Sequence, residues 1–276
     1  MNDKFRAASL SLRLVTAVVL AAVLIAAWTL GGWYVCGLVA VLALVGLGEF
    51  LFLFRREGAF VMKALGLLLG ALYLAAAALL PSLPEHLVLA AGTLAAALYA
   101  LVGWSREKSL EPLANAAVIL CGLLYMPVLL APAMHFTRWE QLFVVLLPAA
   151  SDIAAYFAGV SFGSHPIWPG VSPKKSVEGA VAGLAAAVVV SCVMGLIFGS
   201  APLYAFAALG AVMGVMAQLG DFFESALKRA VNVKDSSHLL PGHGGVLDRL
   251  DSISFCVGTY AVASALYPFF AQAPAL

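Results

Sequence analysis

The chain has 276 residues, of which 63% are hydrophobic and 11% are charged. A soluble domain is about 45–50% apolar and about 25% charged, and one core cannot bury so large an apolar excess, because a soluble surface needs polar groups. The apolar residues form long blocks that short charged stretches separate. This pattern excludes a soluble enzyme, a disordered chain and a secreted disulfide scaffold. It predicts an all-α fold, that of a polytopic membrane protein.

The formal net charge of +1 provides no strong field, so no nucleic-acid partner is expected. The cysteines lie singly inside apolar runs, which favours small apolar packing over disulfide or metal binding. They are Cys36, Cys121, Cys192 and Cys256. The basic N-terminus and the apolar stretch after it resemble a signal peptide. That stretch is as long as a spanning helix and a second one follows at once, so we expect it to be retained.

In chain order, nine stretches reach the roughly 20 mostly apolar residues that a membrane-spanning helix needs. They are residues 12–30, 33–54, 61–81, 86–104, 112–132, 141–162, 179–199, 203–227 and 250–270. We expect residues 1–140, with the first five spans, to form a scaffold. Residues 141–276, with the last four spans, are expected to form the catalytic region.

The basic residues predict how the spans are oriented, because Lys and Arg are enriched in cytoplasmic loops. With nine spans and a cytoplasmic N-terminus, fourteen of the fifteen basic residues lie in cytoplasmic segments, and Arg138 is the exception. This distribution predicts that the C-terminus lies outside. The two most polar loops, residues 163–178 and 228–250, then face the cytoplasm.

Acidic residues within spans are functional candidates, because a charge at the centre of a spanning helix costs about 2.5–3.5 kcal/mol on insertion scales. Glu49 lies late in span two near Arg55 and Arg56, which favours a snorkelling or ion-paired helix end. Asp152 lies in the middle of span six, with Tyr156 one turn on and glycines further along the same face. That polar, small face suits a cavity wall or a close helix contact. We expect Asp152 to be functional.

Two further acidic residues, Asp221 and Glu224, lie at the cytoplasmic end of span eight. Gln218, Asp221, Ser225 and Lys228 follow helical spacing and share one stripe, with Glu224 beside it. A solvated helix end would explain such charges. However, the acidic residues lie one to two helical turns inside the span, and basic residues lie nearer its cytoplasmic end. This arrangement instead indicates a site that binds a metal and phosphate.

The segment 225–251 holds four bases, three aspartates, two histidines and three glycines between two apolar helices. Its Pro-Gly-His-Gly-Gly run, residues 241–245, cannot be helical, and the glycines would let backbone N–H groups approach an anion. Asp248, Arg249 and Asp251 follow this run. One of the two aspartates could cap the next helix, but a cap does not explain the second aspartate or Arg249. Carboxylates hold Mg²⁺ and cationic side chains neutralise phosphates, so this segment favours phosphoryl or nucleotidyl transfer.

The second polar loop supports the same chemistry. Lys174 and Lys175 lie just before span seven, and Ser176 and Glu178 lie where that helix begins. The free N–H groups of a helix start attract anions. The enrichment of basic residues on the cytoplasmic side would by itself explain two lysines, but not the Ser172-Pro173 pair before them.

The segment 225–251 resembles the motif of phosphatidate cytidylyltransferases, also called CDP-diacylglycerol synthases. Every fixed position of that motif is present: Ser225, Lys228, Arg229, Lys234, Asp235, Pro241, Gly242, His243, Gly244, Gly245, Asp248, Arg249 and Asp251. The region from Asp152 to Gly179 is similar to a second region of that family. It departs from the pattern at Ser176, where threonine is usual, and at Val177, where tryptophan is common.

The resemblance implies an integral-membrane enzyme that converts CTP and phosphatidate into CDP-diacylglycerol and pyrophosphate. It also implies Mg²⁺ as a divalent metal, a homodimer in the bacterial inner membrane, and an active site facing the cytoplasm; a monovalent cation is left open. Asp221 and Asp248 would ligate the metal. The other catalytic candidates are Lys228, Arg229, Lys234, Asp235, His243, Arg249 and Asp251. The candidates for binding the phosphates of CTP and phosphatidate are Asp152, Tyr156, Ser172, Lys174, Lys175, Ser225, Gly244 and Gly245.

Two alternatives remain open at this point. A related CTP-dependent lipid enzyme, such as a polyprenol kinase, would use similar metal and phosphate groups. An ion-coupled transporter would use acidic residues such as Asp152, Asp221 and Glu224 to bind its coupling ion. Transporters often carry paired broken helices in two halves, whereas the polar residues here gather in the C-terminal half.

Overall fold

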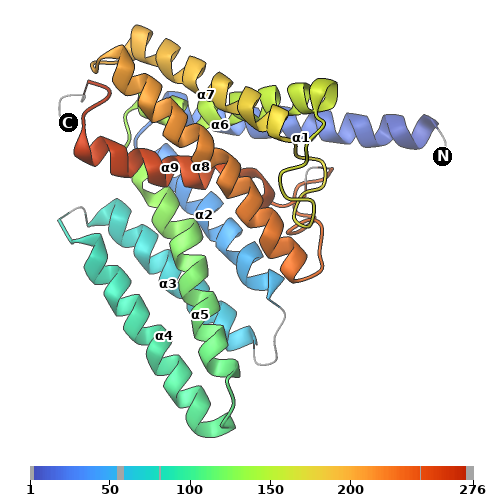
Figure 1. The fold of residues 1–276 in the computed structure, drawn as a ribbon. Helices are drawn as coiled ribbons and strands as arrows, with labels where there is room; N and C mark the ends of the chain where they lie inside the picture. The colour runs from blue at the N-terminus through green and yellow to red at the C-terminus, as the bar shows by residue number, and fades with distance from the viewer. Residues whose placement is uncertain (1–2, 55–58, 81, 243, 272–276) are drawn as a thin grey trace. The chain divides into compact units, whose positions relative to one another are not determined.

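The computed structural model describes residues 3–54, 59–80, 82–242 and 244–271, and for residues 3–14 and 59 it describes the backbone alone. Within these residues the fold is helical, with isolated bridges in place of strands. The main helices are α1 (Asp3–Leu30), α2 (Trp33–Leu53), α3 (Ala59–Leu79), α4 (Glu85–Glu107), α5 (Glu111–Leu123), α6 (Arg138–Phe162), α7 (Val177–Phe198), α8 (Leu203–Ala230) and α9 (Leu247–Leu266) (Figure 1). Each predicted span coincides with one of them, which confirms the all-α class.

The fifth predicted span, residues 112–132, is not one regular helix. α5 ends at Leu123, and a π-helical turn, η1 (Leu124–Val128), and a 3₁₀ turn, η2 (Ala131–Met134), follow it. Pro127 lies within η1. Its ring and its missing N–H do not fit an α-helix interior, and a π turn is a common form of such a local break.

The ninth span was predicted to reach residue 270, and this end is wrong. α9 ends at Leu266, just before Pro268, because a residue that precedes proline avoids the α conformation. The chain then forms a bridge between Phe270 and Gly199, and the backbone N–H of Ser200 donates to the Phe269 carbonyl at 2.9 Å. Both phenylalanines are buried.

Seven helical segments in the described part of the chain are long and apolar enough to cross a membrane. They are α2, α3 from Phe60, α4, the Glu111–Met134 segment, α6, α7 and α8. Within the residues whose side chains are described, α1 contributes the apolar stretch Val15–Leu30, and α9, which begins with Leu247, Asp248 and Arg249, lies outside this set. The composition therefore predicted the class correctly, and the described helices support seven spans.

The contacts divide the chain into two units. Unit 1 contains residues 1–134 and 235–248, and unit 2 contains residues 135–234 and 249–276. The polar segment 235–248 thus belongs with the N-terminal helices, although it follows α8 in the sequence.

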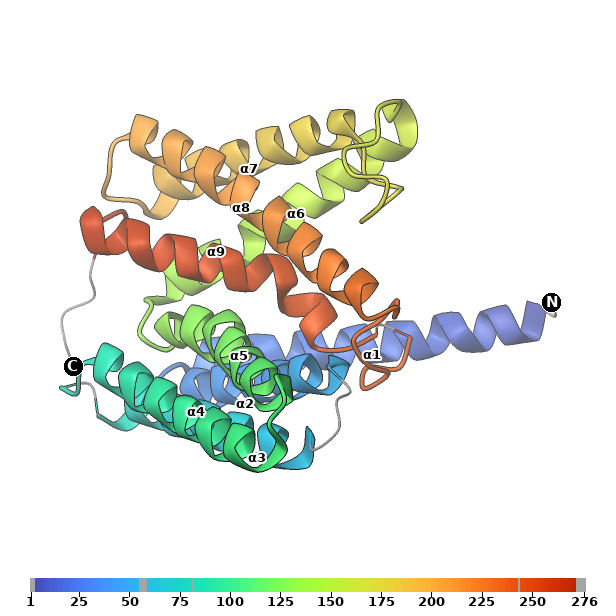
Figure 2. The same cartoon turned by 60° about the horizontal axis from the view of Figure 1, so that its bottom comes forward.

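The core of unit 1 is built from α2, α3 and α5, which pack against one another (Figure 2). Leu47, Phe50 and Leu51 of α2 are fully buried together with Ile119 of α5. The Phe50 ring meets the ring of Tyr125 edge to face, with centroids 5.9 Å apart. This packing makes α2 the central helix of the unit.

In unit 2, α6 packs against α7 and α7 packs against α8, and small residues make both contacts close. Gly183 of α7 faces Ser151 of α6, and Gly210 of α8 faces Ser191 of α7. Small residues at helix contacts are typical of membrane proteins, where close backbone packing replaces the hydrophobic effect. On the face of span six for which a cavity wall or a close helix contact is predicted, Gly159 lies against Gly179 of α7.

Gly210 provides a test of this packing. A Cβ atom at this position would lie 2.6 Å from the Ser191 Cβ and 2.9 Å from the Val188 Cα, so Gly210→Ala should lower stability by about 1–3 kcal/mol. Gly37→Ala is the matched control, because no heavy atom lies within 4 Å of a Cβ there. Thermal unfolding in detergent should show a lower midpoint for Gly210→Ala and an unchanged or higher one for Gly37→Ala. Equal midpoints would contradict the close contact.

Candidate functional site

The polar loop before α7 forms a compact hairpin. The Ile167 N–H donates to the Lys175 carbonyl at 3.1 Å, and the Val177 N–H donates to the His165 carbonyl at 2.8 Å. Ser176 caps α7 by accepting a hydrogen bond from the Gly179 N–H at 3.2 Å. The loop therefore has a defined backbone that places its lysines just before the helix.

A carboxylate from the first turn of α7 closes the hairpin from the other side. Glu178 Oε1 lies 2.6 Å from His165 Nδ1, and Glu178 Oε2 accepts a hydrogen bond from the Ser164 N–H at 3.1 Å. His165 and Glu178 therefore act within the loop itself. The sequence had suggested no partner for either residue.

The hairpin lies against the end of α8, within unit 2. The Trp168 ring meets the Phe222 ring edge to face, with centroids 4.9 Å apart. Lys175 Nζ lies 4.2 Å from the centre of the same Phe222 ring and forms an ion pair with Asp221. Arg229 Nε donates to the Val171 carbonyl at 3.4 Å. The polar loop before α7 and the polar end of α8, which are separate in the sequence, therefore lie side by side.

Asp221 is the centre of an acidic group in unit 2. Its carboxylate is paired with Lys175 and accepts a hydrogen bond from Ser225 Oγ at 3.4 Å. Asp152 of α6 and Asp251 of α9 lie close enough to Asp221 for their charges to interact. Three of the predicted acidic residues thus share one electrostatic environment with a lysine beside them.

Glu224 differs from the solvated helix end considered for the end of span eight. Its side chain is 1% exposed and forms an ion pair with Lys228, one turn further along α8. A charge removed from water needs such a partner, because desolvation strongly disfavours an isolated one. Part of the charge of Lys228 is therefore balanced inside the protein.

In unit 1 the segment 235–248 folds around the Asp248 carboxylate. Asp248 Oδ2 accepts hydrogen bonds from the Gly245 N–H at 2.7 Å, the Ser236 N–H at 3.1 Å and the Ser236 hydroxyl at 3.0 Å. Gly244 has a φ of +82°, a conformation that favours glycine, and its carbonyl accepts a hydrogen bond from the Leu240 N–H at 2.9 Å. The Gly245 amide, expected to face a phosphate, here faces a carboxylate of the protein.

Glu49 is 7% exposed, which corrects the prediction of a snorkelling helix end. The predicted ion pair with Arg55 or Arg56 involves residues that lie outside the described part of the chain. The carboxylate accepts hydrogen bonds from the N–H groups of Val246 at 3.1 Å and Leu247 at 2.7 Å. It is thus a buried acceptor for the start of α9, which span spacing could not indicate.

The remaining candidates are placed as follows. Tyr156, Lys174, Arg229, Lys234, Asp235 and Arg249 are exposed, Ser172 is half-buried, and His243 lies outside the described residues. The candidates in unit 1 are Asp235, Gly244, Gly245 and Asp248; the other described candidates belong to unit 2. Within each unit the structure brings candidates together, around Asp221 in one and around Asp248 in the other.

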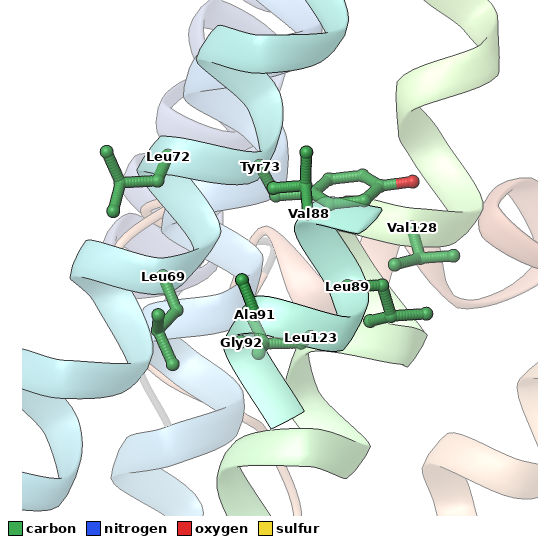
Figure 3. Close-up of a pocket in the computed structure, with 9 residues that line it drawn as sticks. All are labelled: Leu69, Leu72, Tyr73, Val88, Leu89, Ala91, Gly92, Leu123 and Val128. Atoms are coloured by element: carbon green, nitrogen blue, oxygen red, sulfur yellow. The ribbon is translucent and has the colours of Figure 1, made fainter. Parts of the chain in front are cut away.

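An apolar hollow in unit 1 carries no group for this chemistry. It is lined by residues of α3, α4, the end of α5 and η1: Leu69, Leu72, Tyr73, Val88, Leu89, Ala91, Gly92, Leu123 and Val128 (Figure 3). The Tyr73 hydroxyl donates to Glu85 Oε2 at 2.9 Å. A hollow with such a lining does not suit a triphosphate, which needs cationic groups or N–H donors.

Comparison with known proteins decides the family. The sequence profile of the Cytidylyltransferase family matches residues 11–267. The chain belongs to this family.

Several curated relatives of the cytidylyltransferase chain are phosphatidate cytidylyltransferases of bacteria. The protein of Staphylococcus saprophyticus is 37% identical over 144 residues, which cover 52% of this chain and 54% of the relative. The protein of Bacillus subtilis is 45% identical over 107 residues, which cover 38% of this chain and 40% of the relative. The chain therefore spans about half the length of the curated relatives it matches, or less.

The donor atoms of this cytidylyltransferase-family chain suit a hard cation. Among the described residues no three His, Cys, Asp or Glu side chains form a ready-made metal site. Mg²⁺ usually keeps several waters and binds one or two carboxylates together with substrate phosphates. The oxygens of Asp221, beside Asp152 and Asp251, fit that mode of binding.

The contact between Trp168 and Phe222 can be tested directly. Trp168→Ala should increase amide hydrogen exchange in residues 164–172 about two- to tenfold, because an aromatic pair contributes about 0.5–1.5 kcal/mol beyond its buried area. Trp139→Ala is the matched control, since that ring stacks on Phe198 instead. Exchange in residues 164–172 that is the same in the wild type and Trp168→Ala would contradict the anchoring role.

Proposed function

We propose that this chain is an integral-membrane nucleotidyltransferase that makes CDP-diacylglycerol and pyrophosphate from CTP and phosphatidate. The observation that carries the proposal is the group around Asp221, which is paired with Lys175 and lies close enough to Asp152 of α6 and Asp251 of α9 for their charges to interact. Carboxylates for a metal and a cation for phosphate are the parts that this reaction needs. Membership of the cytidylyltransferase family and the names of the bacterial relatives support the same reaction.

In the proposed reaction a phosphate oxygen of phosphatidate attacks the α-phosphorus of CTP. A new P–O bond forms to the lipid phosphate, the bond between the α-phosphorus and the bridging oxygen to the β-phosphate breaks, and pyrophosphate leaves with that oxygen. No covalent enzyme intermediate is needed, because the lipid phosphate is itself the nucleophile. Catalysis is then mainly positioning and charge stabilisation.

The side chains have distinct proposed roles. Asp221 of unit 2 and Asp248 of unit 1 are each proposed as a ligand of Mg²⁺, a metal that would offset the negative charge of the phosphates. The exposed cations would neutralise phosphate oxygens; they are Lys174, Arg229, Lys234 and Arg249. Lys175 forms an ion pair with Asp221, and we propose that it turns to the phosphate when CTP binds.

The proposed setting is the bacterial inner membrane, with nine spans, a cytoplasmic N-terminus, an outside C-terminus and a homodimeric assembly. Phosphatidate keeps its acyl chains in the bilayer and its phosphate at the headgroup level. CTP arrives from the cytoplasm. A site at the cytoplasmic helix ends can therefore receive both substrates, and fourteen of fifteen basic residues support this orientation.

The purified protein provides the direct test of the reaction. With CTP labelled at the α-phosphorus, phosphatidate vesicles and Mg²⁺, label should enter the lipid and one pyrophosphate should be released per product. EDTA should abolish the transfer, because the proposed reaction needs the metal to stabilise charge. Release of CDP together with a phosphorylated lipid would instead indicate a kinase, and ion uptake without turnover would indicate a transporter.

The acidic residues can be tested one at a time. Asp221→Asn and Asp248→Asn should each lower the rate of label transfer about 100-fold or more, because each removes the charge of a proposed metal ligand. Glu85→Gln is the matched control, since Glu85 accepts a hydrogen bond from Tyr73 of α3 and is not one of the proposed groups. Near-normal turnover in a well-folded Asp248→Asn protein would overturn its assignment as a metal ligand.

A further inference from the structure

We infer that Glu49 is a positioning residue, which holds the 236–247 loop and through it sets the place of Asp248. The residue lies on α2, far from this loop in the sequence, and both belong to unit 1. Three donors of the loop converge on its two carboxylate oxygens, and the Ser236 hydroxyl lies within hydrogen-bond distance of both Glu49 and Asp248. The sequence motif contains the loop but not Glu49, so the motif alone does not identify this role.

The contacts use both oxygens. Oε1 accepts hydrogen bonds from the Ser237 hydroxyl at 2.5 Å and the Val246 N–H at 3.1 Å. Oε2 accepts from the Leu247 N–H at 2.7 Å and lies 3.2 Å from the Ser236 hydroxyl. An ionised carboxylate can accept all of these donors, whereas an amide offers one oxygen and presents an NH₂ group to the rest.

The position of the two N–H donors shows what Glu49 does. Val246 and Leu247 lie where α9 begins, and the first N–H groups of a helix have no partner within the helix. A carboxylate at this end also interacts favourably with the helix dipole. Glu49 thus caps α9 from another helix, as a local capping side chain does in other proteins.

Two contacts connect this cap to Asp248. Leu247, whose N–H binds Glu49, is the residue immediately before Asp248. The Ser236 hydroxyl lies between the two carboxylates, 3.2 Å from Glu49 Oε2 and 3.0 Å from Asp248 Oδ2. A substitution of Glu49 should therefore shift the Asp248 side chain in two ways, through the backbone and through the Ser236 hydroxyl that both carboxylates share.

Close packing around Gly245 limits how far the loop backbone can move relative to the Glu49 carboxylate. A Cβ at this position would lie 2.0 Å from Ser236 Oγ and 2.5 Å from Glu49 Oε2. The loop backbone therefore passes directly over the carboxylate. Near the middle of the loop, the Thr16 hydroxyl of α1 donates to the Pro241 carbonyl at 3.3 Å. Helix α1 thus contacts the loop at its middle, and Glu49 of α2 contacts both of its ends.

The experiment compares Glu49→Gln with the Glu85→Gln control in the purified full-length protein. Amide hydrogen exchange should become about tenfold faster in residues 236–248 of Glu49→Gln, while α3 and α4 keep wild-type exchange. The Mg²⁺ concentration for half-maximal label transfer should rise about tenfold, because a group that orients a metal ligand affects metal affinity. Ser237→Ala removes one donor and should change both measurements in the same direction but less; it also serves if Glu49→Gln does not fold.

The two readouts separate the possible outcomes. Unchanged exchange in residues 236–248 of Glu49→Gln and Ser237→Ala would overturn the inference. Faster exchange that is equal throughout unit 1 would also overturn it, since Glu49 would then support the fold as a whole. The Mg²⁺ measurement rests on the proposed function. A wild-type protein without label transfer would overturn that function, and the exchange measurement would still decide whether Glu49 holds the loop.

Discussion

A carboxylate inside an apolar helix bundle needs several hydrogen-bond donors, because removing its charge from water is otherwise very costly. In unit 1 this requirement links Glu49 of α2 to the loop that precedes α9. The loop in turn needs an acceptor for the N–H groups at the start of that helix. Glu49 and the N–H groups of the loop thus provide each other's hydrogen-bond partners. The glycine-containing loop therefore has a defined backbone without an apolar core of its own.

The same principle operates in unit 2 with ion pairs. Lys175 is paired with Asp221, and Lys228 is paired with the buried Glu224. The phenyl ring of Phe222 supports both the lysine and Trp168. The proposed reaction with a triphosphate needs several cations close together, and acidic partners allow several basic residues to share a small region.

These arrangements suggest a division of labour between the polar groups of the chain. Backbone N–H groups of the glycine-containing loop are directed at the carboxylates of Asp248 and Glu49. They serve the internal architecture of the loop, and the phosphates would then be met mainly by long cationic side chains. Long, exposed lysine and arginine side chains can adjust to two substrates of different shape, whereas a rigid nest of backbone amides fits a single anion geometry.

The sequence by itself determined the helical class, the starts and ends of most helices and the family. Apolar blocks must be helical in lipid, since every backbone polar group there needs a partner within the segment. The fixed spacing of polar residues in the segment 225–251 indicated the family, and its profile matches residues 11–267. Local patterns sufficed for these conclusions, because the signals lie close together along the chain.

The tertiary structure decided what local patterns could not. Glu49 looked like a helix end near basic residues, because no local spacing relates it to donors nearly 200 positions later. For Glu224 the sequence left a solvated helix end as one of two explanations, and the burial of this residue depends on neighbouring helices rather than on its own. The break at Pro127 and the early end of α9 also depend on geometry, which mean hydropathy does not measure. Hydrophobicity indicates where a chain enters a membrane, but only packing determines which polar groups meet inside it.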